Sequence, residues 1–149
     1  MRPIWYNYPT ATDTFGMENE FMLGDFLLIV PVTESGQSNV EAFFPGGDRW
    51  FRLDHHESVF HSGTQLVSAG LEEPIPTFIK ENSAFVIRDR IRRSSTLMEN
   101  DPFTLVVSQT VSGLASGEVY FDDGITHDYE KGEFSLKQVK LENNILTYR

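Results

Sequence analysis

The chain has 149 residues, of which 40% are hydrophobic and 13% aromatic, a content typical of a folded protein rather than of a disordered segment. Its formal net charge is −10, so a nucleic-acid backbone or an anionic membrane would repel it. The chain has no cysteine, which excludes disulfides and thiolate metal sites, and no apolar run reaches the ~20 residues of a membrane helix. Composition therefore indicates a folded protein whose partners are neither nucleic acids nor membranes.

The first 24 residues combine an apolar start with a turn-rich stretch. Ile4, Trp5, Tyr6 and Tyr8 follow one another closely, which indicates a buried strand. Because a buried strand at the first residues is unusual, we expect an excised piece of a longer chain. A brief helix is predicted over residues 17–21, although the glycine before it weakens this prediction.

Residues 25–91 contain short β-like runs separated by turn signals. The runs lie at residues 26–32, 40–44, 50–53, 65–68, 77–79 and 84–87. The Pro-Gly-Gly-Asp stretch at 45–48 is interpreted as a hairpin turn. Short strands at intervals of ~8–12 residues predict an antiparallel β-sandwich.

Residues 92–149 begin within a basic connector at 88–95 and then contain a second β-rich set. Strands are predicted over residues 103–109, 118–121, 134–141 and 145–148, and no helix longer than about two turns is expected. The chain is therefore predicted to be all-β, in three parts: residues 1–24, 25–91 and 92–149.

An acidic corner joins two of these predicted strands. Its carboxylates belong to Asp122, Asp123, Asp128, Glu130 and Glu133. Clustered oxygen ligands suit calcium, but their spacing does not match an EF-hand loop. The alternative is a hairpin corner in which Asp side chains accept hydrogen bonds from backbone amides and Gly124 adopts a positive φ. The spacing favours the corner, and calcium binding at Asp122 and Asp123 stays as the second hypothesis.

The sequence gives even less support to other catalytic or metal-binding sites. Adjacent Asp122 and Asp123 would point to opposite faces of a strand, so they make a poor glycosidase pair. His55, His56 and His61 are close in sequence, but they lack the helical spacing of a zinc site and indicate a polar loop, and His127 lies far along the chain. The sequence contains neither a Gly-x-Ser-x-Gly elbow nor a phosphate-binding loop. We predict no catalytic residue, cofactor site or metal site.

Aromatic side chains offer a further hypothesis, because their faces can stack on sugar rings. The candidates are Trp5, Tyr6, Tyr8, Phe43, Phe44, Trp50 and Phe51. Most lie within apolar runs, where burial is worth ~1.5–3 kcal/mol each, so we interpret them as core residues. Trp50 follows a turn and precedes Arg52, and we expect it to be partly exposed.

Several stretches carry a resemblance to a known family. They are residues 1–5 with 8–9, 21–32, 40–51, the Ile-Pro-Thr-Phe-Ile strand at 75–79, 92–95, 101–105 and 117–129. In combination they resemble the C-terminal region of glycoside hydrolase family 31 α-glucosidases, and the later stretches are most similar to glucosidase II α subunits. The resemblance implies the last strand of a catalytic (β/α)8 barrel in residues 1–24, a proximal β-sandwich in 25–91 and the start of a distal one in 92–149. Where the family has a Gly-Gly pair after the Ile-Pro strand, this chain has Lys-Glu-Asn-Ser at 80–83.

The resemblance also bears on function. The family's catalytic aspartates and its substrate-binding histidine lie on earlier barrel strands, so no catalytic residue is carried over to this chain. It implies an accessory segment that is inactive alone, with the catalytic barrel of its parent, a carbohydrate substrate reached through that parent and a regulatory β subunit as partners, in the endoplasmic reticulum lumen. The alternative is a free-standing β-sandwich module that binds carbohydrate or protein through Trp50 or the acidic corner. An independent hydrolase would need a carboxylate pair in a pocket.

Overall fold

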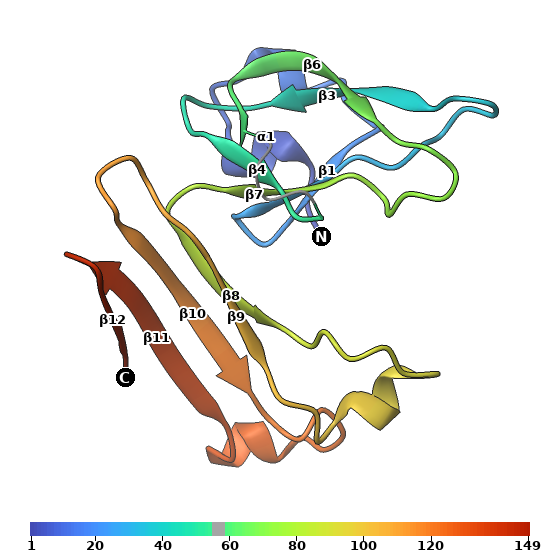
Figure 1. The fold of residues 1–149 in the computed structure, drawn as a ribbon. Helices are drawn as coiled ribbons and strands as arrows, with labels where there is room; N and C mark the ends of the chain where they lie inside the picture. The colour runs from blue at the N-terminus through green and yellow to red at the C-terminus, as the bar shows by residue number, and fades with distance from the viewer. Residues whose placement is uncertain (55–58) are drawn as a thin grey trace. The chain divides into compact units, whose positions relative to one another are not determined.

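A computed structural model describes residues 1–54 and 59–149, and its chain divides into two compact units, Met1–Glu81 and Asn82–Arg149 (Figure 1). All strand pairs found within these described residues are antiparallel. The longest described helices have four residues. The predicted all-β class is confirmed. The three-part division and the assignment of its first part to the end of a catalytic barrel stay predictions.

The first unit contains two sheets. A five-stranded sheet has the order β1 (Phe21–Leu23), β2 (Leu27–Ile29), β7 (Thr77–Lys80), β4 (Trp50–Arg52) and β5 (Val59–Phe60). A second sheet pairs β3 (Asn39–Phe44) with β6 (Gly63–Ser68). The connection of β3 to β4 therefore passes from one sheet to the other, so the interpretation of residues 45–48 as a hairpin turn was wrong.

Aromatic side chains from both sheets form the core of the first unit. Alternate residues of β3 point inward, and Phe44 at its end is fully buried together with Trp50 and Phe78. The Phe44 ring lies 4.8 Å from that of Phe78 in an edge-on arrangement and 5.0 Å from that of Phe60. Burying each such ring stabilises the fold by roughly 1.5–3 kcal/mol. The two sheets thus pack face to face, as the sandwich prediction requires.

The first residues differ from the sequence prediction. Ile4–Asn7 forms a one-turn helix, α1, in place of the predicted strand, with the Tyr8 amide donating to the carbonyl of Ile4. Ile4 is buried whereas Trp5 and Tyr6 are exposed, so the apolar positions follow a helical spacing and not an alternating one. The only strand-like pairing here is the bridge between Arg2 and Met22 in the described chain.

The helix predicted over residues 17–21 was also wrong. The structure has a short 3₁₀ helix earlier, at η1 (Thr12–Thr14), followed by turns and then strand β1. Met22 within β1 is fully buried, and the backbone hydrogen bonds of β1 are made with β2. Tertiary pairing therefore outweighs the weak local helical preference.

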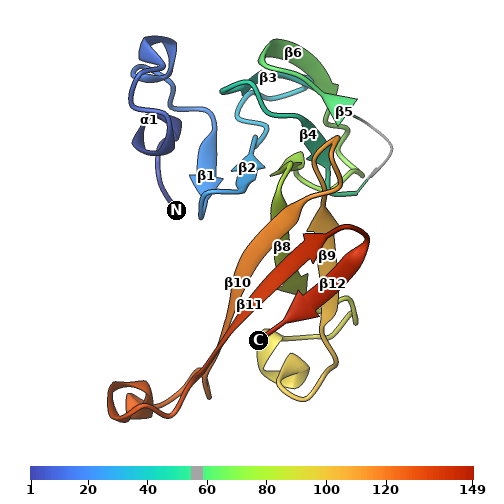
Figure 2. The ribbon, with the colours of Figure 1, turned by 90° about the vertical axis from the view of Figure 1, so that its left-hand side faces the viewer.

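The second unit is a smaller two-layer arrangement. Strand β8 (Ser83–Ile87) pairs with β9 (Thr104–Ser108), and a three-stranded sheet contains β10 (Ala115–Phe121), β11 (Ser135–Glu142) and β12 (Ile145–Tyr148). The layers share a core formed by Ala84, Val119 and Val139. Figure 2 shows the β10–β11 hairpin, coloured orange to red, extending to an end that carries the short helix η3 (Asp128–Lys131). The predicted hairpin is confirmed by the Tyr120–Leu136 and Phe121–Ser135 pairs.

Candidate functional site

The acidic corner has the geometry of a capped turn. The Asp122 carboxylate accepts a hydrogen bond from the Gly124 amide at 2.9 Å, and Asp123 accepts from the amides of Ile125 and Thr126 at 3.1 and 3.0 Å. The Thr126 hydroxyl donates to the other oxygen of Asp123 at 2.7 Å, and this bond is the main reason why the pKa of Asp123 lies below its ordinary value. Gly124 has a φ of 65°. The hairpin-corner interpretation is therefore confirmed.

The other members of the acidic group are used differently. Asp128 forms an ion pair with Lys131 at 2.7 Å on the surface of η3. Within residues 1–54 and 59–149, no group of three or more His, Asp or Glu side chains is arranged to hold a metal ion. The described geometry thus gives the calcium hypothesis no support.

None of the helices that the structure describes is long and apolar enough to cross a membrane.

Of the four candidate histidines, two lie within the residues that the structure describes. His55 and His56 lie outside the described residues. His61 is exposed, and its carbonyl accepts a hydrogen bond from the Gln65 side chain. His127 belongs to the second unit, where its ring lies 5.8 Å from that of Tyr129. Neither described imidazole belongs to a group of three or more His, Asp or Glu side chains that could hold a metal ion.

The aromatic candidates divide into buried and exposed groups. Trp50 is fully buried and its indole N–H donates to the carbonyl of Pro45 at 3.3 Å, so the expectation of an exposed Trp50 was wrong. The reason is that the turn at 45–48 carries the chain between sheets, which places Trp50 against Phe44 in the core. In contrast Trp5 and Tyr6 are 43% and 61% exposed, although we expected core positions.

The exposed side of α1 forms a defined surface, which we call the α1 surface and which comprises Arg2, Trp5, Tyr6 and Asn7. The Arg2 guanidinium lies 5.0 Å from the centre of the Tyr6 ring and donates to the Asn7 side chain at 3.2 Å. Asn7 in turn donates to the carbonyl of Gly24 at 3.1 Å. On the opposite side of α1, Ile4 is buried in the core of the first unit. The α1 surface is therefore held in place by the fold while its aromatic rings stay open to a partner.

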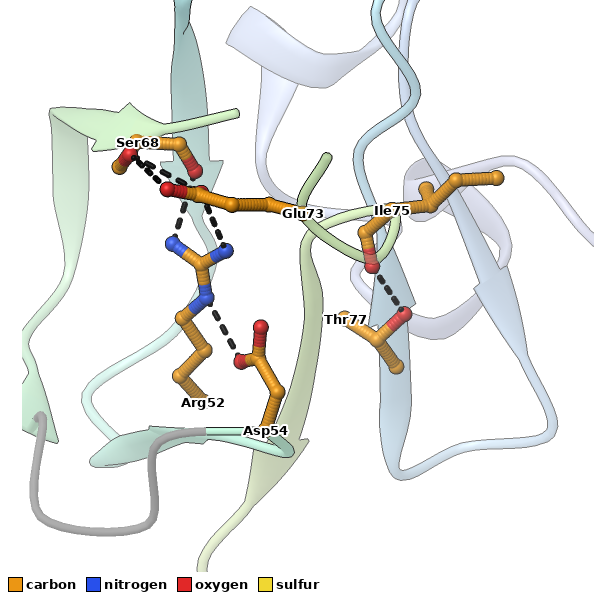
Figure 3. A network of polar contacts seen from close by, with 6 residues as sticks. All are labelled: Arg52, Asp54, Ser68, Glu73, Ile75 and Thr77. Atoms are coloured by element: carbon orange, nitrogen blue, oxygen red, sulfur yellow. Dashed lines mark hydrogen bonds and ion pairs between the residues drawn. The ribbon is translucent and has the colours of Figure 1, made fainter. Parts of the chain in front are cut away.

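A buried arginine organises the loop that precedes β7 (Figure 3). Arg52 is only 4% exposed, and it donates to Asp54 at 2.7 Å, to the Ser68 carbonyl at 2.8 Å and to Glu73 at 3.4 Å. The hydroxyl of Ser68 also donates to Glu73 at 2.9 Å, and it is the main reason why the pKa of Glu73 is lowered. The network ties β4 and β6 to the loop at residues 69–76. Sequence reasoning missed it because the partners lie up to 21 residues away.

A second network organises the basic connector. Asp101 is 7% exposed and accepts two hydrogen bonds from Arg92, at 2.8 and 2.5 Å. Arg90 lies 3.5 Å from the same carboxylate. The paired bonds from Arg92 hold the pKa of Asp101 below its usual range. The connector is thus held by two partly exposed arginines that pair with one buried carboxylate.

The two units of antiparallel strands define the class, an all-β region, and comparison with known proteins identifies the family. Residues 1–85 match the model of the glycosyl hydrolase family 31 C-terminal domain. The chain belongs to glycosyl hydrolase family 31.

Similar proteins support the same assignment. The probable glucan 1,3-alpha-glucosidase of Oryza sativa subsp. japonica is 37% identical over 99% of this chain, and the glucosidase 2 subunit alpha of Saccharomyces cerevisiae is 36% identical over 98%. A crystal structure of a glucosidase II alpha subunit, with alpha3-Glc2 bound, covers 98% of the chain with a TM-score of 0.89 and 31% identity. The chain spans about 16% of the length of each. The resemblance to glucosidase II α subunits is confirmed, and the chain corresponds to an accessory segment.

Proposed function

We propose that the chain serves as the C-terminal accessory segment of a retaining α-glucosidase whose catalytic carboxylates lie outside these residues. Retaining hydrolysis needs two carboxyl groups about 5–5.5 Å apart, one as nucleophile and one as acid/base. Asp122 and Asp123 instead accept hydrogen bonds from the backbone of their own turn. The names of two relatives, a probable glucan 1,3-alpha-glucosidase and a glucosidase 2 subunit alpha, support hydrolysis of terminal α-linked glucose as the activity of the parent.

The way in which the segment acts on its parent is proposed to depend on the α1 surface. Its two aromatic rings are exposed in this chain, the Tyr6 ring lies against the Arg2 guanidinium, and the buried Ile4 anchors the helix that carries both rings. In the parent, these rings pack against the catalytic barrel and brace it. Each Å² of apolar area that is buried in this way contributes about 25 cal/mol, so two large rings are enough to affect the stability of the barrel.

The test replaces one ring by a charge in the full-length protein that carries this segment. Trp5→Asp is expected to lower the thermal stability and the α-glucosidase activity together, because a carboxylate would be desolvated at the contact. Leu71→Asp is the matched control, since Leu71 is 98% exposed on a loop of the same unit. Equal behaviour of the two variants would contradict the bracing role.

The proposal also covers the partner subunit and the cellular compartment of the parent. One similar structure is described as an ER glucosidase II heterodimeric complex of the catalytic subunit and the binding domain of a regulatory subunit, with a TM-score of 0.89 and 33% identity. We propose a regulatory β subunit and the endoplasmic reticulum lumen for the parent on this ground. Co-purification of a tagged parent with a second subunit from a microsomal fraction would support both, and recovery of a lone chain in the cytosol would contradict both.

A further inference from the structure

The second unit contains an open groove of about 740 Å³. It lies among the end of β8, the segment with the 3₁₀ helix η2 (Ser95–Met98) and the end of β10 with the acidic corner. Arg88, Phe103, Tyr120 and Asp122 are among the residues that line it. Sites for small molecules typically have volumes of about 300–1,000 Å³, so this groove has room for a ligand of that size.

Two aromatic rings stand open at the groove. Phe103 is 43% exposed and Tyr120 is 49% exposed. Each ring is held by a second one, because Phe103 lies 4.8 Å from Phe121, and Tyr120 stacks on Phe134 at 5.4 Å. The groove therefore offers fixed apolar faces from two different segments of the unit.

Arg88 supplies a polar group at the same place. Its guanidinium lies 4.4 Å from the centre of the Phe103 ring, and one terminal nitrogen donates to the carbonyl of Glu99 at 3.1 Å. The Nε atom is buried and makes no hydrogen bond to any part of the chain that the structure describes. Arg88 nevertheless lines the groove, and its guanidinium has five N–H donors, so a ligand oxygen bound here finds a donor on this side chain.

The charges of the lining select the kind of ligand. Asp122, Asp123 and Glu99 line the groove together with one arginine, and the whole chain carries −10, so an anion is disfavoured. A purely apolar ligand would leave the Arg88 donor unsatisfied. A sugar has an apolar ring face for stacking and hydroxyls that both accept from arginine and donate to carboxylates.

We propose that this groove binds a neutral oligosaccharide, separately from the catalytic site proposed for the parent. Tyr120 provides the stacking face, the exposed part of Phe103 adds apolar surface beside it, Arg88 donates to a sugar hydroxyl, and Asp122 accepts from one. This site does not depend on the accessory role proposed above, because it uses only residues of the second unit.

The test is a titration of the ¹⁵N-labelled 149-residue protein with isomaltotriose and with maltotriose, followed by amide and Arg88 Nε–H chemical shifts. Saturable shifts at residues 120–125 and at Arg88 are expected. Tyr120→Ala should weaken binding by about tenfold or more, the loss of one stacking contact. Tyr148→Ala is the control, because Tyr148 is 75% exposed on β12 and does not line the groove.

A second variant keeps the test decisive if Tyr120→Ala disturbs folding. Arg88→Met removes the donor and leaves the pairing of β10 untouched, so it should weaken binding while the spectrum stays folded. Glucose 6-phosphate should bind more weakly than the neutral sugars. The proposal is overturned if neither trisaccharide gives saturable shifts, if both variants bind like the native protein, or if the phosphate ester binds best.

Discussion

Gly117 of β10 passes the backbone of Ala84 in β8 so closely that a Cβ atom on Gly117 would lie 1.8 Å from the Ala84 carbonyl oxygen. The same Cβ would lie 2.7 Å from the carbonyl carbon. No side chain can rotate away to relieve this contact, because both atoms belong to the backbone. The two layers of the second unit can therefore approach this closely only because Gly117 has no side chain.

Gly117→Ala is predicted to destabilise the second unit by about 1–3 kcal/mol, since the strands must separate to admit a methyl group. Urea denaturation followed by far-UV circular dichroism checks this. Tryptophan fluorescence would not report on the second unit, because both tryptophans belong to the first unit. Gly16→Ala is the control, as a Cβ there would meet nothing within 4 Å. An unchanged urea midpoint for Gly117→Ala would show that the crossing is looser than described.

Glu20 gives the first unit a pH dependence. Its carboxylate is 4% exposed and accepts from the Phe43 amide at 3.2 Å, but burial raises its pKa to about 7. The ordinary value of 4.5 applies to the unfolded chain, so this group favours folding below about pH 4.5 and that contribution is lost as the pH rises through 7. The loss amounts to at most about 3 kcal/mol.

Glu20→Gln is therefore predicted to be more stable than the native protein at pH 8 and similar to it at pH 5. The amide oxygen of Gln can still accept from Phe43 without carrying a charge. Urea midpoints of the first unit at the two pH values test this, with the exposed Glu18→Gln as the control. A difference between Glu20→Gln and the native protein that does not change with pH would contradict the assignment.

Asp101 has the opposite pH dependence. Arg92 lowers its pKa, so its contribution to folding is present above the ordinary value of 3.8 and is lost as the pH falls through the lower folded value. Arg92→Met should raise the pKa of Asp101, because the paired hydrogen bonds disappear. A carboxyl ¹³C titration measures this shift directly, and Arg93→Met, which changes an exposed neighbour, serves as the control. A titration of Asp101 unaltered by Arg92→Met would show that other groups set its pKa.

The strands and the acidic corner were predictable because their signals are local. Alternating apolar residues and turn residues recur within a few positions, and an Asp before Gly caps its own turn. The one-turn helix α1 was not predictable, since Ile4, Trp5, Tyr6 and Tyr8 suit a strand or a helix equally well until the neighbours of Ile4 are known.

Features that depend on distant parts of the chain escaped the sequence analysis. The burial of Trp50 follows from a sheet-to-sheet crossing, and the role of Arg52 depends on Ser68 and Glu73, which arrive from another strand and loop. The groove of the second unit combines Arg88, Phe103 and Tyr120 from three segments. The spacing of residues in the sequence does not show which distant residues will be in contact until the order of the strands in the sheets is known.

The most direct test of the accessory role is the release of p-nitrophenol from p-nitrophenyl α-glucoside. It compares the 149-residue protein, the full-length parent, the parent truncated before this segment, and the truncated parent mixed with the 149-residue protein. We predict activity in the full-length parent, none in the 149-residue protein alone, loss on truncation and recovery in the mixture. Hydrolysis by the 149-residue protein alone, or full activity of the truncated parent, would contradict the account.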